Sequence, residues 1–170
     1  MLRIAQGDEP AFRLLARRHL PRALGLARRI TGNDADAEEV VQEALLRVWV
    51  NAARWRPSAA FRTWLYRVIV NLCLNRKRRA PFAALEEAGE PADTSPDAVA
   101  AAESREAERL IAEAVAALPA RQRAAIVLTY FEGNSNAEAA AILGMSISGI
   151  ETLLVRARRT LRKTLASFLD

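Results

Sequence analysis

Apolar residues recur every three or four positions along most of the chain, which is the spacing of one face of an α-helix. In the first half this spacing predicts three helices. Asp8 caps the first helix, Pro10 lies in its first turn, and Pro21 predicts a kink or a break in it. Ser58 is expected to cap the third helix. The apolar stripes of the three helices are Phe12, Leu15, Leu20, Leu24, Ala27 and Ile30; Val40, Val41, Ala44, Leu45 and Val48; and Phe61, Trp64, Leu65, Val68, Ile69 and Leu72.

The last third of the chain has the pattern of a helix-turn-helix. Ser135 and Glu138 have the spacing of a capping box, and Gly144 suits the left-handed end of a short helix. A longer helix capped by Ser146 follows. A short helix, a tight turn and a longer helix form a motif that often binds DNA, and a helical hairpin without a ligand is the alternative. The predicted buried stripe of the longer helix is Ile147, Ile150, Leu154, Ala157, Leu161 and Leu165.

Between these halves, residues 81–103 are rich in proline and acidic residues and have no sustained apolar period. Helices are expected again over 110–118, stopped by Pro119, and over 120–131. We therefore predict an all-α fold with two small helical domains, residues 1–80 and 104–170, joined by a flexible acidic linker. An acidic loop inside one domain is the alternative, although such long loops are uncommon.

Charge is distributed unevenly over the 170 residues, whose net charge is +5. Residues 1–80 hold 16 Lys/Arg and 7 Asp/Glu, residues 81–120 hold 2 and 9, and residues 121–170 hold 7 and 4. The two basic segments favour a polyanionic partner.

Several classes of function find no support in the sequence. One cysteine and one histidine exclude an intrachain disulfide and a Cys/His zinc site. No apolar run approaches the roughly 20 residues of a membrane span. There is no glycine-rich phosphate loop and no nucleophile with a neighbouring base. We expect a soluble protein that is not an enzyme and needs no metal or cofactor.

The second helix of the predicted helix-turn-helix has a basic, polar exposed face. Arg156 could bind a guanine edge, Glu151 a cytosine amine, and Thr152 either kind of base. Arg158, Arg159, Arg162 and Lys163 suit contacts with phosphates. The predicted DNA-contacting residues of this helix are Ser146, Ser148, Glu151, Thr152, Val155, Arg156, Arg158 and Arg159. A solvated basic face is the alternative for any single arginine.

The first domain combines basic, aromatic and acidic segments. Arg54, Trp55 and Arg56 alternate charge with an aromatic ring, which suits single-stranded nucleic acid, although Trp55 could instead cover the edge of the core. The helix face with Glu38, Glu39, Gln42 and Glu43 would repel DNA, so a functional role there requires a basic protein surface. Solvated helix charges are the alternative.

Several segments together resemble the extracytoplasmic-function (ECF, group IV) sigma factors of the sigma-70 family. The first domain carries Asp36–Trp49, Phe61–Arg67 and the basic run Asn75–Arg79. The second domain carries Leu118–Arg123 and Tyr130–Gly133, and its helix-turn-helix ends in Val155–Arg162. The match covers nearly the whole chain in the order of the family.

The resemblance implies a dissociable subunit that directs bacterial core RNA polymerase to promoters in an envelope or environmental stress response. It also implies a cytoplasmic monomer that does not itself insert into membranes. A cognate anti-sigma factor would hold this monomer inactive and could tether it at the inner membrane. Partners would be promoter DNA and the clamp helices and flap of the polymerase. Glu38, Glu39, Gln42 and Glu43 would bind the clamp helices, and the helix-turn-helix would bind the minus-thirty-five element. The minus-ten element would contact Arg54, Trp55, Arg56, Arg62, Arg67, Asn71, Asn75, Arg76, Lys77 and Arg78.

The recognition helix departs from the family pattern at Glu151, Thr152 and Leu153, where family members often carry Lys or Arg followed by Ser and Arg, so one or two expected cations are replaced. An atypical base preference is therefore expected. The main alternative function is a stand-alone dimeric helix-turn-helix regulator, which would bind two half-sites about one helical turn apart. A helical adaptor with incidental basic charge would bind nucleic acid without sequence preference.

Overall fold

The computed structural model describes the backbone of residues 1–56, 60–77 and 96–166, and the side chains of these residues except 77 and 96–104. This part of the chain is helical and contains no strand, so the all-α prediction is confirmed. The elements are α1 (Leu2–Ala5), α2 (Glu9–Thr31), α3 (Asp34–Val50), the 3₁₀ turn η1 (Ala52–Arg54), α4 (Phe61–Lys77), α5 (Pro96–Ala116), α6 (Ala120–Ile126), the π-helical turn η2 (Val127–Phe131), α7 (Asn136–Leu143) and α8 (Ile147–Ala166).

Helices α2, α3 and α4 pack together into a first unit whose ends follow local sequence rules. The carboxylate of Asp8 accepts a hydrogen bond from the Ala11 amide at 2.8 Å, as predicted for the cap of α2. Gly32 ends α2 in the left-handed conformation at φ 74°, and Asn33 then caps α3. Of the kink or break predicted at Pro21, the break is wrong, because α2 continues through this residue to Thr31. Apolar residues on both sides of Pro21 pack on the same core, which keeps the helix continuous.

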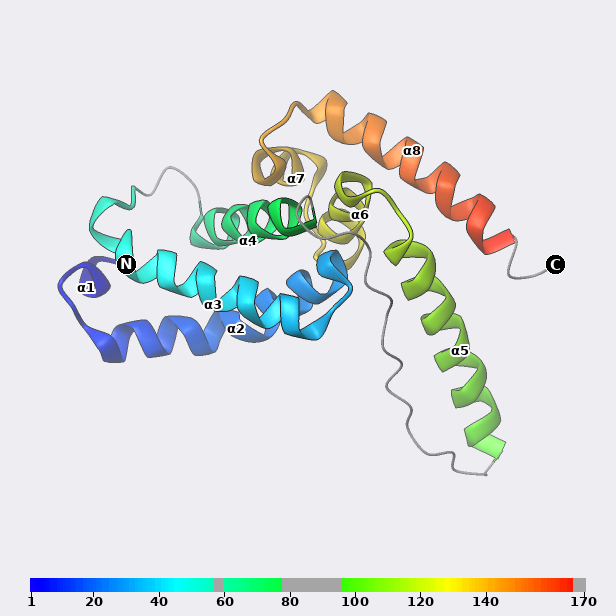
Figure 1. Cartoon of the computed structure of the whole chain (residues 1–170), viewed down its shortest axis with the longest axis horizontal. Coiled ribbons are helices and arrows are strands. Elements are labelled where there is room, and N and C mark those ends of the chain that lie inside the picture. The colour runs from blue at the N-terminus through cyan, green and yellow to red at the C-terminus, as the bar shows by residue number, and fades with distance from the viewer. Residues whose placement is uncertain (57–59, 78–95, 167–170) are drawn as a thin grey trace.

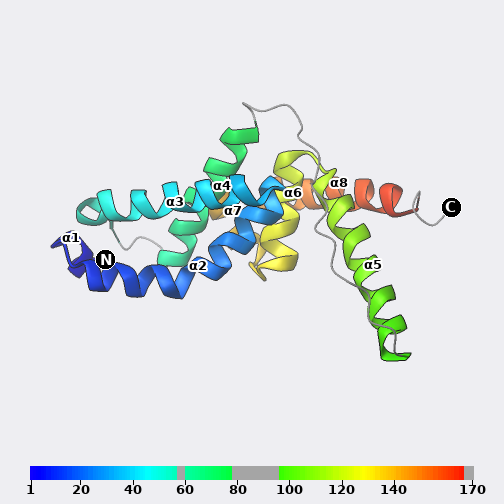
Figure 2. The ribbon, with the colours of Figure 1, turned by 60° about the horizontal axis from the view of Figure 1, so that its bottom comes forward.

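The boundary between the halves differs from the expected one. Helix α5 begins at Pro96, so residues 96–103 of the predicted linker are helical. Proline is favoured at the start of a helix because its missing amide has no partner there. In Figures 1 and 2 the first turns of α5 extend away from the rest of the molecule. The predicted cap Ser58 and the predicted site residue Arg78 lie outside the described residues.

Helices α7 and α8 form the predicted helix-turn-helix. The Ser135 hydroxyl accepts from the Glu138 amide at 3.2 Å, and the Glu138 carboxylate accepts from the Ser135 amide at 2.9 Å. Gly144 is left-handed at φ 64°, and Ser146 caps α8 through the Gly149 amide at 3.1 Å. The two helices are bent by 100° relative to each other.

The predicted buried stripe of α8 is correct in its middle and wrong at its start. Ile150, Leu154 and Ala157 are buried, whereas Ile147 is 49% exposed. Ile147 is the first residue of α8, on the turn where the chain changes direction between the two helices.

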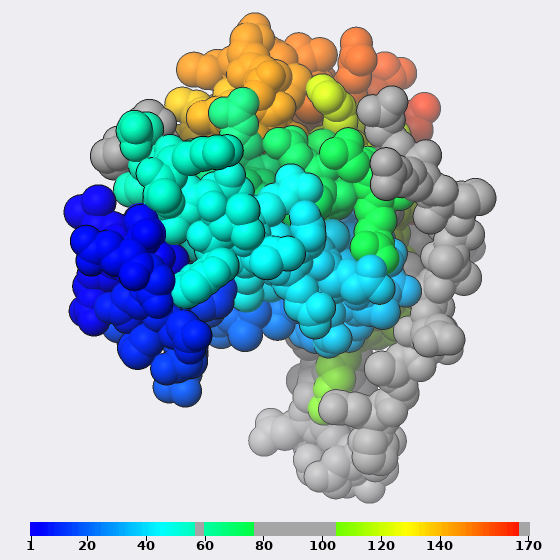
Figure 3. Space-filling view, turned by 60° about the vertical axis from the view of Figure 1, so that its left-hand side comes forward, coloured from blue at the N-terminus to red at the C-terminus, as the bar shows by residue number. Residues whose placement is uncertain are grey.

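The two units pack against each other around one continuous cluster of buried residues. Helix α7 lies on α4, and α6 with η2 lies near the C-terminal end of α2 (Figure 1). In the space-filling view of Figure 3, the second unit sits directly on the surface of α4. The sequence did not predict this contact between the units. Among the described residues no single helix is long and apolar enough to cross a membrane, although α7 and α8 taken together as a bent pair meet the same length and composition criteria.

Candidate nucleic-acid interface

The exposed face of α8 presents short polar side chains followed by arginines. Ser148, Thr152 and Arg159 lie on one side of the helix, because residues four and seven positions apart share a face. Within the described part of the chain, Arg156 and Arg159 form no ion pair. Val155 is 58% exposed and leaves an apolar spot on this face. The residues that the sequence predicts to contact duplex DNA are therefore accessible on α8.

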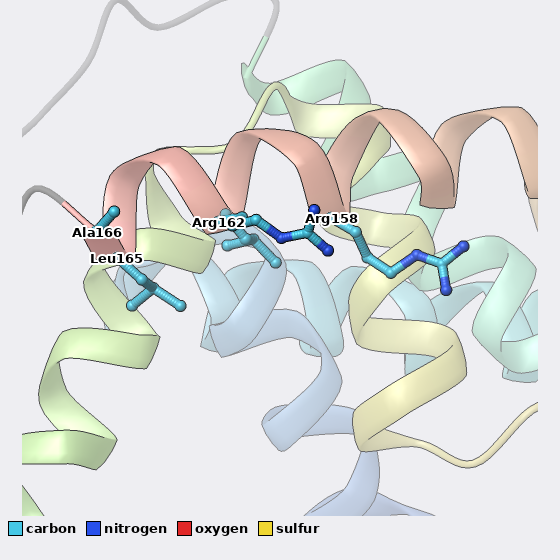
Figure 4. A pocket seen from close by; sticks show the side chains of 5 residues that line it. Arg158, Arg162, Leu165 and Ala166 are labelled. Carbon is cyan, nitrogen blue, oxygen red and sulfur yellow. The ribbon is translucent and has the colours of Figure 1, made fainter.

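Three of the residues predicted to contact DNA, Ser146, Ser148 and Arg158, have further contacts or lie on another side of the helix. The Ser146 hydroxyl is used as the helix cap and lies 3.1 Å from the Ser148 hydroxyl. Arg158 is turned about 120° around the helix from Thr152, at 100° per residue. It lines a shallow pocket on the flank of α8 together with Leu161, Arg162, Leu165 and Ala166 (Figure 4). Arg158 is thus separated from the face that carries Thr152 and Arg159.

The loop after α3 carries the predicted basic and aromatic segment. Arg54 and Arg56 are exposed, and Trp55 is half-buried. Neither arginine is ion-paired within the described residues. On α4, Asn71 and Asn75 are exposed as well. Trp64, predicted to be a core residue, is half-buried and packs against the core beside Phe61.

The N-terminal part of α4 contacts the second unit. The Tyr66 hydroxyl donates a hydrogen bond to the Glu132 carboxylate at 2.7 Å, and the Arg62 guanidinium lies 3.6 Å from the Glu138 carboxylate. A methyl group at Gly144, in the turn between α7 and α8, would lie 3.6 Å from the Arg67 guanidinium. Of the predicted DNA-binding residues, Arg62 is therefore half-buried at the contact between the units, whereas Arg67 lies near Gly144 and remains exposed.

The acidic face of α3 is accessible, and the structure adds two apolar residues to it. Glu38, Glu39 and Gln42 are exposed, and Glu43 is half-buried beside Arg47 at 2.8 Å. Leu46 and Val50 are 56% and 66% exposed. They continue the stripe of Glu39 and Glu43 at intervals of three and four residues, so acidic and apolar side chains form one surface. The pattern could have shown this, because both residues lie off the predicted core stripe.

Arg76 links the predicted DNA-binding surface of α4 to the acidic face of α3, which were predicted as separate surfaces. This predicted DNA-binding residue donates to the Asp36 carboxylate at 2.8 Å and also binds the Glu39 carboxylate on the acidic face. The hydrogen bond to Glu39 raises the pKa of the Arg76 guanidinium above its usual range. The side chain of Lys77 is outside the described residues.

A histidine and several arginines gather near the start of α4. The His19 ring contacts the Phe61 ring edge to face, with 5.0 Å between centroids. Burial lowers the pKa of His19, and the nearby charges of Arg18, Arg22 and Arg62 lower it further. Cys73 is fully buried in the core, and the described residues contain no group of three side chains suited to hold a metal ion.

Comparison with known proteins gives two matching family models. Residues 15–81 match Sigma-70 region 2, and residues 108–161 match Sigma-70, region 4. Among curated proteins, the ECF RNA polymerase sigma factor SigL of Mycobacterium tuberculosis is 37% identical over 169 residues, covering 95% of this chain and 92% of the relative. The ECF RNA polymerase sigma factor SigM of the same organism is 35% identical over 162 residues, covering 94% of this chain and 79% of the relative.

Solved structures share the arrangement of the whole chain. CnrH, solved in complex with the cytosolic domain of CnrY, is 29% identical with a TM-score of 0.70, over 98% of this chain and 94% of the other. The sigma factor RpoE of Bartonella quintana, solved with the anti-sigma factor NepR, is 21% identical with a TM-score of 0.68, over 92% of this chain and 97% of the other. At 21% identity, the likeness to RpoE concerns the fold alone.

Proposed function

The chain belongs to the extracytoplasmic-function sigma factors of the sigma-70 family, and on this premise we propose which of its surfaces bind the polymerase and which bind the promoter. It is an alternative sigma factor, which directs core RNA polymerase to a particular set of promoters. The observation that carries the assignment is the presence of an accessible acidic and apolar face on α3 together with an accessible basic recognition helix, α8.

The α3 face binds the clamp helices of core polymerase. Glu38, Glu39 and Gln42 supply the polar contacts, and Leu46 and Val50 supply apolar area that is lost from water on binding. An acidic rim beside exposed apolar residues fits a basic protein surface and disfavours DNA, so this face is assigned to the protein partner.

The α4 side of the first unit binds the minus-ten element as a single strand. The exposed Arg54 and Arg56 beside Trp55 provide phosphate contacts and a ring on which a base can stack. On α4 the exposed Arg67, Asn71 and Asn75 and the half-buried Arg62 extend this surface.

The α8 side of the second unit binds the minus-thirty-five element as duplex DNA. Ser148, Thr152 and Arg156 face base edges, and Arg159 faces a phosphate. Arg158, on the flank of α8, is assigned to the edge of the contact. Glu151 in place of a cation gives this helix a base preference different from the common one in the family.

The chain acts by binding and has no catalytic site of its own. We place it in the bacterial cytoplasm, where core polymerase is found, and under the control of an anti-sigma factor, as the family resemblance implies. Anti-sigma control predicts a second protein that binds this chain more tightly than core polymerase does.

The experiment that tests this proposal is transcription by core polymerase reconstituted with the purified chain on a library of genomic fragments. Specific start sites are expected, and alignment of the sequences upstream should give both promoter elements. Glu38→Lys with Glu39→Lys should abolish binding to core polymerase by charge reversal, whereas Glu106→Lys with Glu108→Lys, two exposed positions on α5, should not. Failure to bind core polymerase, with a dimer protecting a palindrome, would instead establish the stand-alone regulator.

A further inference from the structure

We propose that Arg76, near the C-terminal end of α4, is a positioning residue for the acidic face of α3. Through ion pairs with Asp36 and Glu39 it fixes the Glu39 carboxylate before a basic partner binds, and it makes no contact with the promoter strand. This inference rests on the proposed function, because it takes the α3 face as the surface that binds core polymerase. It adds to that surface a residue of the neighbouring helix that the sequence predicts to contact DNA.

Arg76 uses two different nitrogens of its guanidinium for two carboxylates of α3. Its Nε donates to the Asp36 Oδ1 at 2.8 Å, and its Nη2 donates to the Glu39 Oε2. These partners lie 40 and 37 positions away in the sequence, so the contact depends on the packing of α3 against α4. Because the guanidinium is planar and its N–H groups point in fixed directions, the two bonds set the positions of both carboxylates.

Asp36 is held in place at one end of this arrangement. It lies in the first turn of α3, where its amide donates to the Asn33 side chain at 2.9 Å. The positive end of the helix dipole stabilises a carboxylate at this position. Glu39 follows three residues later on the same side of the helix, and its side chain is 62% exposed. Arg76 therefore connects an exposed glutamate to a residue that is held at the start of the helix.

The surroundings of Arg76 do not suit a phosphate. A phosphate at its guanidinium would lie beside the carboxylates of Asp36 and Glu39, which repel it. Arg54 and Arg56, in contrast, have no ion-pair partner within the described residues. The charge of Arg76 is thus already used within the first unit, whereas the charges of the loop arginines are available to DNA.

Positioning before binding lowers the cost of forming an interface. A glutamate side chain without a partner samples several rotamers and loses this freedom when a cation binds it. Glu39 has lost part of this freedom in the unbound chain, because Arg76 holds it. Arg47 contacts Glu43 at 2.8 Å further along α3 in a similar way. The face therefore presents carboxylates in fixed places beside its exposed apolar residues.

Removal of the Arg76 charge separates a positioning role from a purely electrostatic one. Arg76→Gln makes the face more negative by one charge, so a basic partner that responded to charge alone would bind more tightly. We expect the opposite, a loss of about fivefold in affinity for core polymerase, because Glu39 must then be ordered during binding. Arg76→Lys keeps the charge but lacks the planar fork, so it should recover only part of the loss.

The measurement is the equilibrium affinity of the fluorescently labelled full chain for core polymerase. The matched control is Arg109→Gln on α5, because Arg109 also bridges two carboxylates, Glu106 and Glu113, away from the α3 face. The control should change the affinity by less than about twofold. Thermal unfolding shows whether each variant is folded, and Arg76→Lys replaces Arg76→Gln in the test if the latter does not fold. Affinity for core polymerase that is unchanged or tighter in the folded variant would overturn the positioning role.

A double-mutant cycle shows whether Arg76 acts through Glu39. Glu39→Gln alone should weaken binding to core polymerase, and Arg76→Gln added to it should cause less than about a further twofold loss. Losses that simply multiply would overturn the inference, because Arg76 would then act independently of Glu39.

Transcription with the chain in excess separates polymerase binding from DNA binding. On a promoter mapped in the library experiment, saturating Arg76→Gln should give the transcript level of the unsubstituted chain. A defect that persists at saturation, with unchanged affinity for core polymerase, would mean that Arg76 binds DNA and would overturn the inference.

The same substitutions distinguish this inference from the proposed function. If Glu39→Gln weakens polymerase binding and Arg76→Gln does not, the α3 face stands and the positioning role is wrong. If neither substitution changes the affinity for core polymerase, the assignment of the α3 face to the polymerase fails as well.

Discussion

The two surfaces assigned to promoter DNA differ in their contacts with the rest of the chain. On α8, Ser148, Thr152 and Arg159 face outward along the helix-turn-helix. On α4, Arg62 and Tyr66 are bound by carboxylates of the other unit. The proposed duplex-binding side chains of α8 are thus exposed, whereas on the proposed strand-binding surface Arg62 is paired with Glu138 of the other unit and Arg67, Asn71 and Asn75 stay exposed. The two surfaces therefore differ in how much they contact the rest of the chain.

The largest expected effect concerns Arg123 of α6, which anchors the second unit to α2 through the Ile30 carbonyl. Arg123→Ala removes two hydrogen bonds of a buried guanidinium and leaves space between α6 and α2, so it should lower the free energy of unfolding by about 3 kcal/mol. Arg121→Ala, an exposed position on the same helix, should change it by less than about 0.5 kcal/mol. Urea denaturation measures both, and equal small losses would mean that the anchor contributes little.

The exposed surface is tested by Arg156→Ala. If this arginine binds a guanine edge through two hydrogen bonds, promoter binding should weaken by about 1–3 kcal/mol and the base preference at that position should relax. Arg162→Ala, on the flank of α8, should weaken binding to all promoters about equally, and by less than Arg156→Ala weakens binding to its preferred promoter. Transcription from a mapped target promoter that is unaffected by Arg156→Ala would show that α8 is docked differently.

The hydrogen bond from Tyr66 to Glu132 makes the contact between the two units sensitive to alkaline pH. The pKa of Tyr66 is raised in the folded chain, so its stabilising contribution is complete below the unfolded pKa near 10 and is lost as pH rises above that value. Tyr66→Phe should cost about 1 kcal/mol at pH 7. It should also remove part of the decline in stability between about pH 10 and pH 11, measured against the unsubstituted chain. An identical pH profile for both chains would contradict the role of this hydroxyl.

The smallest effect is expected at Glu138, where the helix cap and the contact between the units meet. Glu138→Gln should change stability by less than about 0.5 kcal/mol, because the capping box persists and the ion pair with Arg62 is partly exposed. Glu138→Ala removes the side-chain half of the box and should cost about 1 kcal/mol. Thermal unfolding of the two variants, measured in parallel, shows whether the helix cap or the charge of Glu138 contributes more to the stability of the chain.

Features governed by neighbouring residues could be predicted from the sequence. The caps by Asp8, Ser135 and Ser146 and the left-handed Gly144 follow rules that act within four residues, and all four are confirmed. The family could be predicted as well, because its motifs extend along both halves of the chain, and the comparisons confirm it. The assignments of single site residues stay predictions.

Features that depend on distant partners could not be predicted. Tyr66 and Glu132 are 66 residues apart and Arg123 and Ile30 are 93 apart, and no local pattern links either pair. Pro21 has the local signature of a break, yet packing on both sides keeps α2 continuous. Ile147 fits the apolar period of α8, but its position in the first turn leaves it exposed.

The capping box of α7 lies wholly within the second unit. Its hydrogen bonds join Ser135 and Glu138, so they travel with the helix when the two units move apart. Opening then breaks contacts between preformed bodies and requires no helix to melt and refold. Rigid-body motions of this kind take microseconds to milliseconds, much less than the time that refolding of a domain can need.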